Sequence, residues 1–255
     1  MKVGVFDSGL GGLTVLAELL KAAQGVEFYY LGDTARVPYG IRSTETVRRY
    51  ALESARFLME FGVDALVVAC NTVSARAFDF LKEKLPKTPV FEVVSPAVAE
   101  AARTAKKTVG VIGTPATVTS GVYERKLKAV RNDLKVLQKA TPLLVPLAEE
   151  GLVEGPVAET VLNHYLSPWR GKIDLLLLGC THYPLLEKTV KKLFPEWKVV
   201  NSARPLARKL KPLLKGGGKN GVHLFFTDRT AFLDRFLASV KLEGEVRNFE
   251  VVSLE

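Results

Sequence analysis

The sequence predicts an α/β fold of two similar lobes, each a mostly parallel sheet flanked by helices, with the active site in the cleft between them. Three observations support this prediction. Short apolar segments alternate with longer segments of helical periodicity, as in βαβ units. The apolar segments are continuous runs of Val, Ile and Leu, which is typical of parallel strands buried on both faces. Two blocks of sequence also recur in the same order.

The recurring blocks each consist of an apolar strand followed by a polar loop. One pair is VGVFDSG at Val3–Gly9 and VGVIGTP at Val109–Pro115, offset by 106 residues. The other is ALVVACNT at Ala65–Thr72 and LLLLGCTH at Leu175–His182, whose cysteines are offset by 110 residues. Buried strands are commonly rich in Val and Leu, so chance is the alternative explanation. The shared order and the nearly equal offsets favour two similar lobes.

Each element follows from its local pattern: strands from short apolar runs between turn residues, and helices from apolar residues that recur with the helical period. A flexible linker is predicted at Lys215–Asn220, which reads KGGGKN. The predicted strands are Lys2–Phe6, Glu27–Leu31, Ala65–Ala69, Val90–Val94, Val109–Ile112, Leu134–Lys139, Leu175–Leu178, Lys198–Val200 and His223–Thr227. The predicted helices are Gly12–Ala22, Ser43–Phe61, Ser74–Lys84, Ala97–Ala105, Val118–Val130, Pro156–Tyr165, Leu185–Phe194 and Pro205–Leu214.

Composition excludes several classes of protein. Apolar residues are 47% and charged residues 25% of the 255 residues, which excludes a disordered chain. The net charge of +9 suits either a nucleic acid or a small acidic substrate as partner. The densest basic clusters, Arg204–Lys215 and Lys188–Lys192, contain no interleaved aromatic residues. A solvated basic face is therefore favoured over a nucleic-acid surface.

The location of the protein and its cysteine chemistry follow from simple counts. No apolar run approaches the ~20 residues of a membrane span, and the opening MKVGVF is strand-like rather than a signal peptide. We therefore expect a cytoplasmic protein with no membrane partner. Two cysteines, Cys70 and Cys180, are too few for a disulfide framework or a Cys-rich zinc site.

The candidate site follows from the parallel topology. In open parallel sheets, ligands bind beyond the carboxyl ends of the strands, so the residues directly after each strand are expected to line a shared cleft. These residues supply two thiols, an imidazole, carboxylates and small hydroxyl or amide donors, but no lysine or arginine. They are Asp7, Ser8, Gly9, Asp33, Thr34, Cys70, Asn71, Thr72, Thr114, Thr117, Cys180, Thr181 and His182.

Each of these residues also has a purely structural interpretation. A buried cysteine usually only packs, but here both cysteines stand at matching places in two repeats and precede a polar pair. A redox disulfide would require the lobes to bring the cysteines together, since no CxxC motif is present. Asp7 is also placed to cap the next helix. In the same way, His182 is placed at a helix start where its ring nitrogens can hydrogen-bond within the protein without a role in a site.

Nucleotide and metal binding are weaker interpretations. The SGLGG segment at Ser8–Gly12 partly resembles a dinucleotide loop, and Asp33 lies near the ribose-binding position of that motif. However, Thr14 stands where the motif requires a small residue. No phosphate-loop motif is present, and His, Cys and Asp do not recur at the spacing of metal ligands.

Two thiols that face each other across a cleft suit proton transfer at a stereocentre. One thiol removes a proton from one side of the carbon, and the other delivers a proton to the opposite side. A free thiol has a pKa near ~8.5, which a neighbouring cation or a helix N-terminus lowers, and both cysteines precede a predicted helix. His182 is placed to exchange a proton with Cys180. Asp7 or another carboxylate is placed to exchange a proton with Cys70.

Six motifs together resemble glutamate racemases, members of the aspartate/glutamate racemase family. The resemblance covers Lys2 to about Ser202 and implies interconversion of L- and D-glutamate without cofactor or metal, as an isomerase that supplies D-glutamate for peptidoglycan. It also implies two α/β lobes with the site between them. The motifs are FDSGLGG at Phe6–Gly12, LGDTARVPYG at Leu31–Gly40, VVACNTVSA at Val67–Ala75, IGTPATVTSGVY at Ile112–Tyr123, PLAEEGL at Pro146–Leu152 and LGCTHYPLL at Leu178–Leu186.

The resemblance also implies roles for individual residues. The catalytic cysteines fall on Cys70 and Cys180, with Asp7 assisting the first, and His182 and Glu149 near the second. The implied substrate-binding residues are Asp7, Ser8, Tyr39, Gly40, Asn71, Thr72, Thr114, Thr117, Thr181 and His182. Because the first lobe of the family takes back the C-terminal segment, we expect a discontinuous first lobe at residues 1–96 plus 206–255 and a second lobe at 97–205.

Two positions depart from the family's motifs, Val73 where Ala is commoner and Asn201 where Asp is commoner. They concern pocket shape and local turn bonding, not proton transfer.

The rival interpretations are a two-cysteine racemase or isomerase acting on aspartate, hydantoins or maleate, and a non-catalytic two-lobe protein that binds an acidic amino acid. The binding protein needs neither thiol, whereas the racemase needs both. The sequence leaves open the oligomeric state, a homodimer included, and activation by a peptidoglycan precursor.

Overall fold

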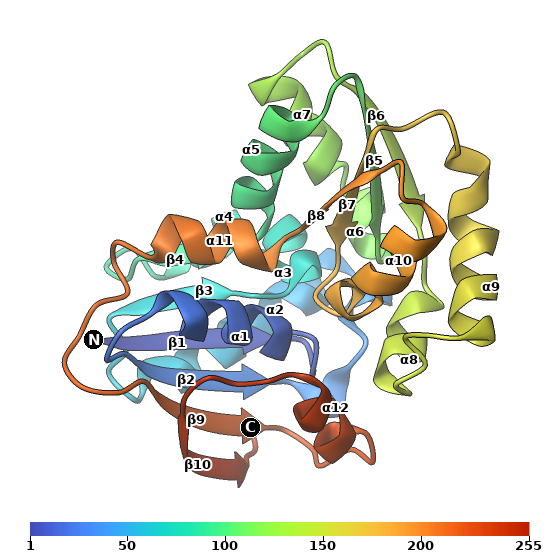
Figure 1. The fold of residues 1–255 in the computed structure, drawn as a ribbon. Coiled ribbons are helices and arrows are strands. Elements are labelled where there is room, and N and C mark those ends of the chain that lie inside the picture. The colour runs from blue at the N-terminus through green and yellow to red at the C-terminus, as the bar shows by residue number, and fades with distance from the viewer. Residues whose placement is uncertain (255) are drawn as a thin grey trace.

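The computed structural model describes residues 1–254 and contains two parallel sheets, one in each lobe (Figure 1). The first sheet has the strand order β10-β9-β2-β1-β3-β4, and the second has the order β6-β5-β7-β8. The strands are β1 (Lys2–Asp7), β2 (Glu27–Gly32), β3 (Ala65–Val68), β4 (Val90–Glu92), β5 (Thr108–Gly113), β6 (Lys135–Ala140), β7 (Leu175–Gly179), β8 (Lys198–Asn201), β9 (Gly221–Phe226) and β10 (Glu245–Val251).

The two sheets share a four-strand topology. The order β2-β1-β3-β4 in the first sheet matches β6-β5-β7-β8 in the second, and neighbouring strands pair in parallel throughout. In the first sheet, Val5 of β1 lies opposite Tyr30 of β2 and Val67 of β3. The recurring sequence blocks thus occupy equivalent central strands, β1 with β5 and β3 with β7. The predicted fold class is confirmed.

Helices cover both faces of both sheets (Figure 1). The α-helices are α1 (Leu13–Ala22), α2 (Thr44–Met59), α3 (Asn71–Arg76), α4 (Phe78–Lys84), α5 (Val94–Thr104), α6 (Pro115–Thr119), α7 (Val122–Val130), α8 (Leu144–Glu149), α9 (Pro156–Leu166), α10 (Glu187–Leu193), α11 (Ala203–Leu210) and α12 (Leu233–Ser239). Short 3₁₀ helices are η1 (Thr34–Arg36), η2 (Tyr39–Ile41), η3 (Ser167–Trp169) and η4 (Tyr183–Leu186).

The helical cover explains why the central strands are apolar at every position. Side chains alternate between the two faces of a strand. In β7, Leu175 and Leu177 pack with α5 and α7, whereas Leu176 and Leu178 pack with α9 on the opposite face. All four side chains are fully buried. A strand covered on both faces therefore appears in the sequence as a continuous apolar run.

The structure contains every predicted strand, with small shifts at the ends, but divides two predicted helices. The helix predicted at 74–84 comprises α3 and α4, which are separated at Ala77. The helix predicted at 118–130 comprises α6 and α7, and Gly121 between them has φ +65°, a left-handed conformation that glycine adopts readily. The elements α8, α12 and β10 were not predicted. Most residues of β10 are exposed, so it lacks the apolar run that marks a buried strand.

The chain crosses between the lobes after β4 and again after β8. At the first crossing, the Glu92 carboxylate accepts hydrogen bonds from the backbone N–H groups of Val94 and Ser95. At the second, Asn201 accepts from the backbone N–H of Arg204. Strands β9 and β10 then return the C-terminal segment to the first sheet. We propose that the domain limits lie at these two crossings, close to the predicted limits at 96/97 and 205/206.

Of the two departures from the motifs, Asn201 is the last residue of β8, and Val73 lies in α3, three residues after Cys70. Asn201 donates its side-chain N–H to the buried Glu187 carboxylate at 3.1 Å. An aspartate at this position has no such donor when ionised and would bring two carboxylates into contact, so asparagine suits the neighbouring glutamate. Val73 is fully buried in the core of the first lobe.

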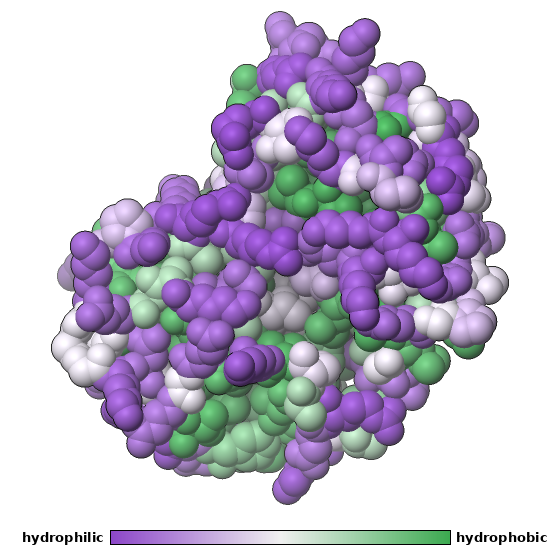
Figure 2. Space-filling view, in the orientation of Figure 1, coloured by the Kyte–Doolittle hydropathy of each residue, from purple (hydrophilic) through white to green (hydrophobic). Residues whose placement is uncertain are grey.

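Hydrophilic side chains cover most of the visible surface of the second lobe, whereas the first lobe shows both hydrophilic and hydrophobic areas (Figure 2). The basic segment that begins at Arg204 is amphipathic: Leu206 and Leu210 are buried in the first-lobe core, while Arg208 and Lys209 are exposed. Within residues 1–254, no helix combines the length and the apolar character that crossing a membrane requires.

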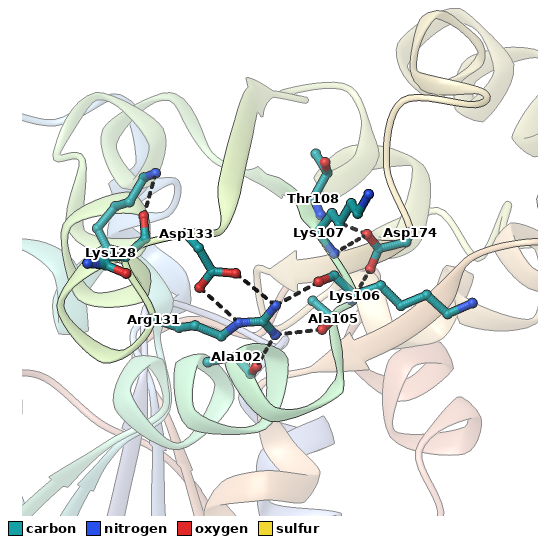
Figure 3. A network of polar contacts seen from close by, with 10 residues as sticks. Ala102, Ala105, Lys106, Lys107, Thr108, Lys128, Arg131, Asp133 and Asp174 are labelled. Carbon is teal, nitrogen blue, oxygen red and sulfur yellow. Dashed lines mark hydrogen bonds and ion pairs between the residues drawn. The ribbon is translucent and has the colours of Figure 1, made fainter.

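Two charged side chains secure the loop between α5 and β5 (Figure 3). The Asp174 carboxylate accepts three hydrogen bonds of 2.7 Å, from the backbone N–H groups of Lys106, Lys107 and Thr108. Arg131 donates to backbone carbonyls at the C-terminal end of α5. Burial raises the pKa of Asp174, but the three N–H groups outweigh it and hold that pKa below its usual value.

We expect Asp174→Asn to lower the free energy of unfolding by about 1–3 kcal/mol at neutral pH, the usual range for hydrogen bonds to a charged group. Because the folded-state pKa is depressed, this stabilisation is present above the unfolded pKa of ~3.9 and is lost as the pH falls through the folded value. Chemical denaturation at several pH values measures both effects. Asp133→Asn is the control, since that carboxylate is exposed and Arg131 is the side chain that it bonds. Equal stability of the two variants at neutral pH would contradict the prediction.

Candidate active site

A cavity between the lobes, at the carboxyl ends of β1, β3, β5 and β7, brings the two cysteines together. Both cysteines are free and buried. The lining residues include no lysine or arginine, as expected for the strand-end residues. They are Ser8, Val37, Pro38, Tyr39, Gly40, Cys70, Asn71, Thr72, Thr114, Val145, Cys180, Thr181 and His182.

The first half of the site contains Cys70, which follows β3 and is the N-cap residue of α3. Its Sγ lies 3.4 Å from the hydroxyl oxygen of Ser8, the residue after β1. Burial raises the pKa of Cys70 to about 12, and the nearby Asp7 carboxylate adds to this shift. Hydrogen bonds from Ser8 and from the backbone of Val73 offset it only in part. Cys70 therefore favours the neutral thiol.

The second half of the site contains Cys180 and a buried histidine–carboxylate pair. Cys180 Sγ lies 3.8 Å from His182 Nδ1, and His182 Nε2 lies 3.0 Å from Oε1 of Glu149, the last residue of α8. Burial lowers the pKa of His182, but the Cys180 sulfur and the Glu149 carboxylate outweigh it and raise that pKa to about 10. Both neighbours therefore favour the protonated form of His182.

Asp7 links the two halves from the end of β1. Its Oδ2 accepts a hydrogen bond from the backbone N–H of Gly9, and its Oδ1 accepts one from the Thr181 hydroxyl of the other lobe at 3.3 Å. Burial raises the pKa of Asp7 above its usual value. The charge of His182 and these hydrogen bonds offset only part of that increase. Asp7 does not line the cavity itself but contacts Thr181, which does.

The SGLGG segment provides the close approach between the lobes. A Cβ atom at Gly11 would lie 2.4 Å from Thr181 Oγ1 and 2.6 Å from His182 Nδ1, so only glycine fits. Thr14 donates its hydroxyl to the Thr181 carbonyl at 2.8 Å. The partial likeness to a dinucleotide loop therefore has another physical cause, which is close contact between Gly11 of this segment and the Thr181 and His182 side chains.

Three threonine hydroxyls meet across the lobes. Thr72 Oγ1 lies 2.9 Å from Thr114 Oγ1, and Thr117 Oγ1 lies 3.0 Å from Thr114 Oγ1 and 3.4 Å from Thr72 Oγ1. Thr72 and Thr114 line the cavity, whereas Thr117 is fully buried and supports them. The cluster offers neutral hydroxyl donors to an anionic ligand.

Asp33 follows β2 but does not line the cavity. Its carboxylate accepts hydrogen bonds from the Tyr39 hydroxyl, from Arg36 Nε at 2.7 Å and from the Thr227 hydroxyl at 2.8 Å. Tyr39 and Gly40 form one wall of the cavity. Asp33 thus anchors that wall rather than contacting a ligand.

Predicted and observed site residues differ in two ways. Six of the predicted residues do not line the cavity: Asp7, Gly9, Asp33, Thr34, Thr117 and Glu149. Of these, Asp7, Asp33, Thr117 and Glu149 contact residues that do. Conversely, sequence reasoning missed three apolar lining residues, Val37, Pro38 and Val145. Apolar side chains without a periodic pattern cannot be told from core residues in a sequence. Residues 1–254 contain no group of three or more His, Cys, Asp and Glu side chains placed to hold a metal ion.

Comparisons with known proteins agree with this geometry. The family model of Asp/Glu/Hydantoin racemases matches residues 4–210. The glutamate racemase of Aquifex aeolicus (strain VF5) is 51% identical over 93% of this chain and 92% of that protein. The structure of glutamate racemase from Francisella tularensis in complex with D-glutamate has a TM-score of 0.91 and 33% identity, covering 100% of this chain and 98% of that one. The Aquifex pyrophilus glutamate racemase structure has a TM-score of 0.82 and 49% identity, covering 97% and 98%.

We expect Glu149→Gln to lower the pKa of His182 by about 1–3, because the substitution removes an adjacent negative charge. NMR titration of the imidazole signals measures this pKa, and assignment is simple because the chain has three histidines. In the wild type, the pair stabilises the fold fully below the unfolded-state pKa of ~6.5, and this contribution is lost as the pH rises through about 10.

The matched control for this prediction is Glu150→Gln, which removes an exposed carboxylate from the next position. This control variant should leave the pKa of His182 at its wild-type value. An unchanged titration in the Glu149→Gln variant would show that the carboxylate does not hold the histidine protonated.

Proposed function

Because the chain belongs to the Asp/Glu/Hydantoin racemase family, we propose that it is a glutamate racemase that interconverts L- and D-glutamate by cofactor-independent proton transfer between two cysteines. The observation that carries the proposal is the pair of thiols in one cavity. Cys70 and Cys180 come from equivalent strand ends of the two lobes, and each has its own acid–base neighbour. As the resemblance to glutamate racemases implies, D-glutamate would serve peptidoglycan synthesis.

In the proposed reaction, the α-carbon of glutamate lies between the two sulfur atoms. One sulfur, as a thiolate, takes the α-proton: its S–H bond forms as the C–H bond breaks, and the electron pair remains on the α-carbon next to the carboxylate. The other sulfur, as a thiol, then delivers its proton to the opposite face of that carbon. One thiol and one thiolate are present before and after, with their roles exchanged. Nothing is oxidised or consumed.

The electrostatics of the site suit a starting state with one thiol and one thiolate. On one side, His182 Nδ1 lies 3.8 Å from Cys180 Sγ and is placed to exchange a proton with it. On the other side, burial and Asp7 keep the proton on Cys70. After each turnover these protonation states are reversed, and His182 and Asp7 are the groups placed to restore them.

The cavity holds anionic groups with neutral donors in this proposal. Hydroxyl and amide donors come from both lobes, and no cationic side chain other than His182 lines the cavity. The donors are Ser8, Asn71, Thr72, Thr114 and Thr181. Such short side chains hold fixed positions, so the depth of the cavity sets the distance between the two carboxylates that it accepts.

The direct test of the proposed function is chiral chromatography of glutamate and aspartate incubated with the purified protein, with a chelator and without added pyridoxal phosphate. We expect kcat/KM for glutamate to exceed that for aspartate by at least ~10²-fold, since a missing methylene costs ~10–200-fold and unpaired donors add to this. Equal values, or a preference for aspartate, would make the protein an aspartate racemase. Turnover of neither acid would favour a binding protein, and activity only after added metal or pyridoxal phosphate would exclude cofactor independence.

The two-cysteine mechanism predicts different half-reactions for Cys70→Ala and Cys180→Ala. Each variant should lose racemisation by at least ~10²–10⁴-fold, the usual contribution of a general acid or base. Each should still exchange the α-hydrogen of one enantiomer in deuterated water, because one sulfur remains to remove and return a proton on its own face. The preferred enantiomer should differ between the variants, as read by NMR. Racemisation at the wild-type rate in either variant would rule out the mechanism.

A further inference from the structure

The hydroxyl group of Tyr123 is fully buried and has no part in the proton transfer proposed above. Tyr123 lies in α7 of the second lobe, and its hydroxyl donates a hydrogen bond of 2.5 Å to Oδ1 of Asn71. Asn71 belongs to the first lobe, follows Cys70 directly and lines the cavity. This hydrogen bond therefore joins the two lobes and ends on a residue of the site.

The nitrogen of the Asn71 amide also has a defined partner. Nδ2 donates to the hydroxyl oxygen of Ser202 at 3.3 Å, and Ser202 is buried at the second crossing between the lobes. An amide nitrogen carries two N–H groups, so one remains available. Because Asn71 lines the cavity, this second N–H is the group that it can offer to a carboxylate there.

We propose that Tyr123 is a positioning residue for the substrate, because its hydroxyl holds the Asn71 amide in the orientation that presents an N–H group to an anion in the cavity. The two orientations of an amide have nearly the same shape, so packing alone cannot choose between them. The Tyr123 hydroxyl favours one of them, because a phenol is a stronger hydrogen-bond donor than acceptor and so prefers to face Oδ1 rather than Nδ2. In the other orientation, Oδ1 would occupy the place of Nδ2 and face the substrate carboxylate with a partial negative charge.

Two features of the surroundings support this role. Burial, together with the nearby Glu92 and Cys180, raises the pKa of Tyr123 well above its usual value, so the hydroxyl keeps its proton and remains a donor. The aliphatic hydroxyl of Ser202 accepts from Nδ2 or donates to Oδ1 about equally well, so it selects neither orientation, whereas the Tyr123 phenol donates better than it accepts. The selection therefore depends on Tyr123.

The inference rests on the proposed function for the identity of the ligand, an amino acid with two carboxylates. Tyr123→Phe removes only the hydroxyl group. We expect KM for glutamate to rise at least about ten-fold, while kcat stays within about three-fold, because the cysteines keep their neighbours. The affinity for D-glutamate, measured by calorimetry, should fall by a similar factor. Thermal unfolding confirms that the variant is folded.

The matched control is Tyr183→Phe. Tyr183 is equally buried in the second lobe, but its hydroxyl bonds only Thr141, and it does not line the cavity. This control should leave KM and D-glutamate affinity at their wild-type values. If both tyrosine variants weaken binding to the same extent, the effect is general to lost buried hydroxyls, and the inference is wrong.

A double-mutant cycle with Asn71→Ala separates positioning from a structural effect. If Tyr123 acts through Asn71, then Tyr123→Phe should change binding little once Asn71 is alanine. Additive effects, or wild-type binding by Tyr123→Phe alone, would overturn the inference. Failure of the positioning role can be told apart from failure of the proposed function. If the proposed function is wrong, the wild-type protein does not racemise glutamate. D-glutamate calorimetry still tests the positioning role when no turnover occurs, and wild-type protein that binds no D-glutamate would overturn it.

Discussion

The buried contact between Asp7 and the Thr181–His182 segment is the constraint on which the site depends. It joins the carboxyl ends of β1 and β7, and it places a carboxylate of one lobe beside a cation of the other. Buried charges without partners cost several kcal/mol, so these groups must be placed together. Gly11 makes the contact possible, since a side chain there would collide with Thr181 and His182. The lobes are therefore joined where the chemistry takes place.

The internal repeat gives each lobe a similar backbone but a different electrostatic environment for its thiol. Cys70 lies beside a hydroxyl and near a carboxylate, and its pKa is raised. Cys180 lies beside a histidine that Glu149 helps to keep protonated. A racemase must accept both mirror-image substrates, yet at any moment one sulfur must hold a proton and the other must lack one. Two different environments around equivalent strand ends suit that requirement.

Behind the lining residues stands a set of buried side chains that hold them in place. Asp33 anchors Tyr39, Thr117 contacts Thr72 and Thr114, and Tyr123 bonds Asn71. Small neutral donors must be held in fixed positions to bind a carboxylate well, because they lack the reach and the charge of an arginine. The lobes contribute to this support jointly, so the position of one lobe affects the donors of the other.

The sequence by itself determined the two lobes, their strands and the neighbourhood of Cys70 and Cys180, because parallel strands end at one edge and covered strands appear as apolar runs. It did not reveal the exposed strand β10 or the apolar lining residue Val145, which have no distinctive pattern. Only the tertiary structure decided where strand-end side chains point. Asp33 follows a strand as Asp7 does, yet it contacts a wall of the cavity instead of the opposite lobe. Such orientations depend on contacts between residues far apart in the chain, as between Tyr123 and Asn71, and no local pattern records them.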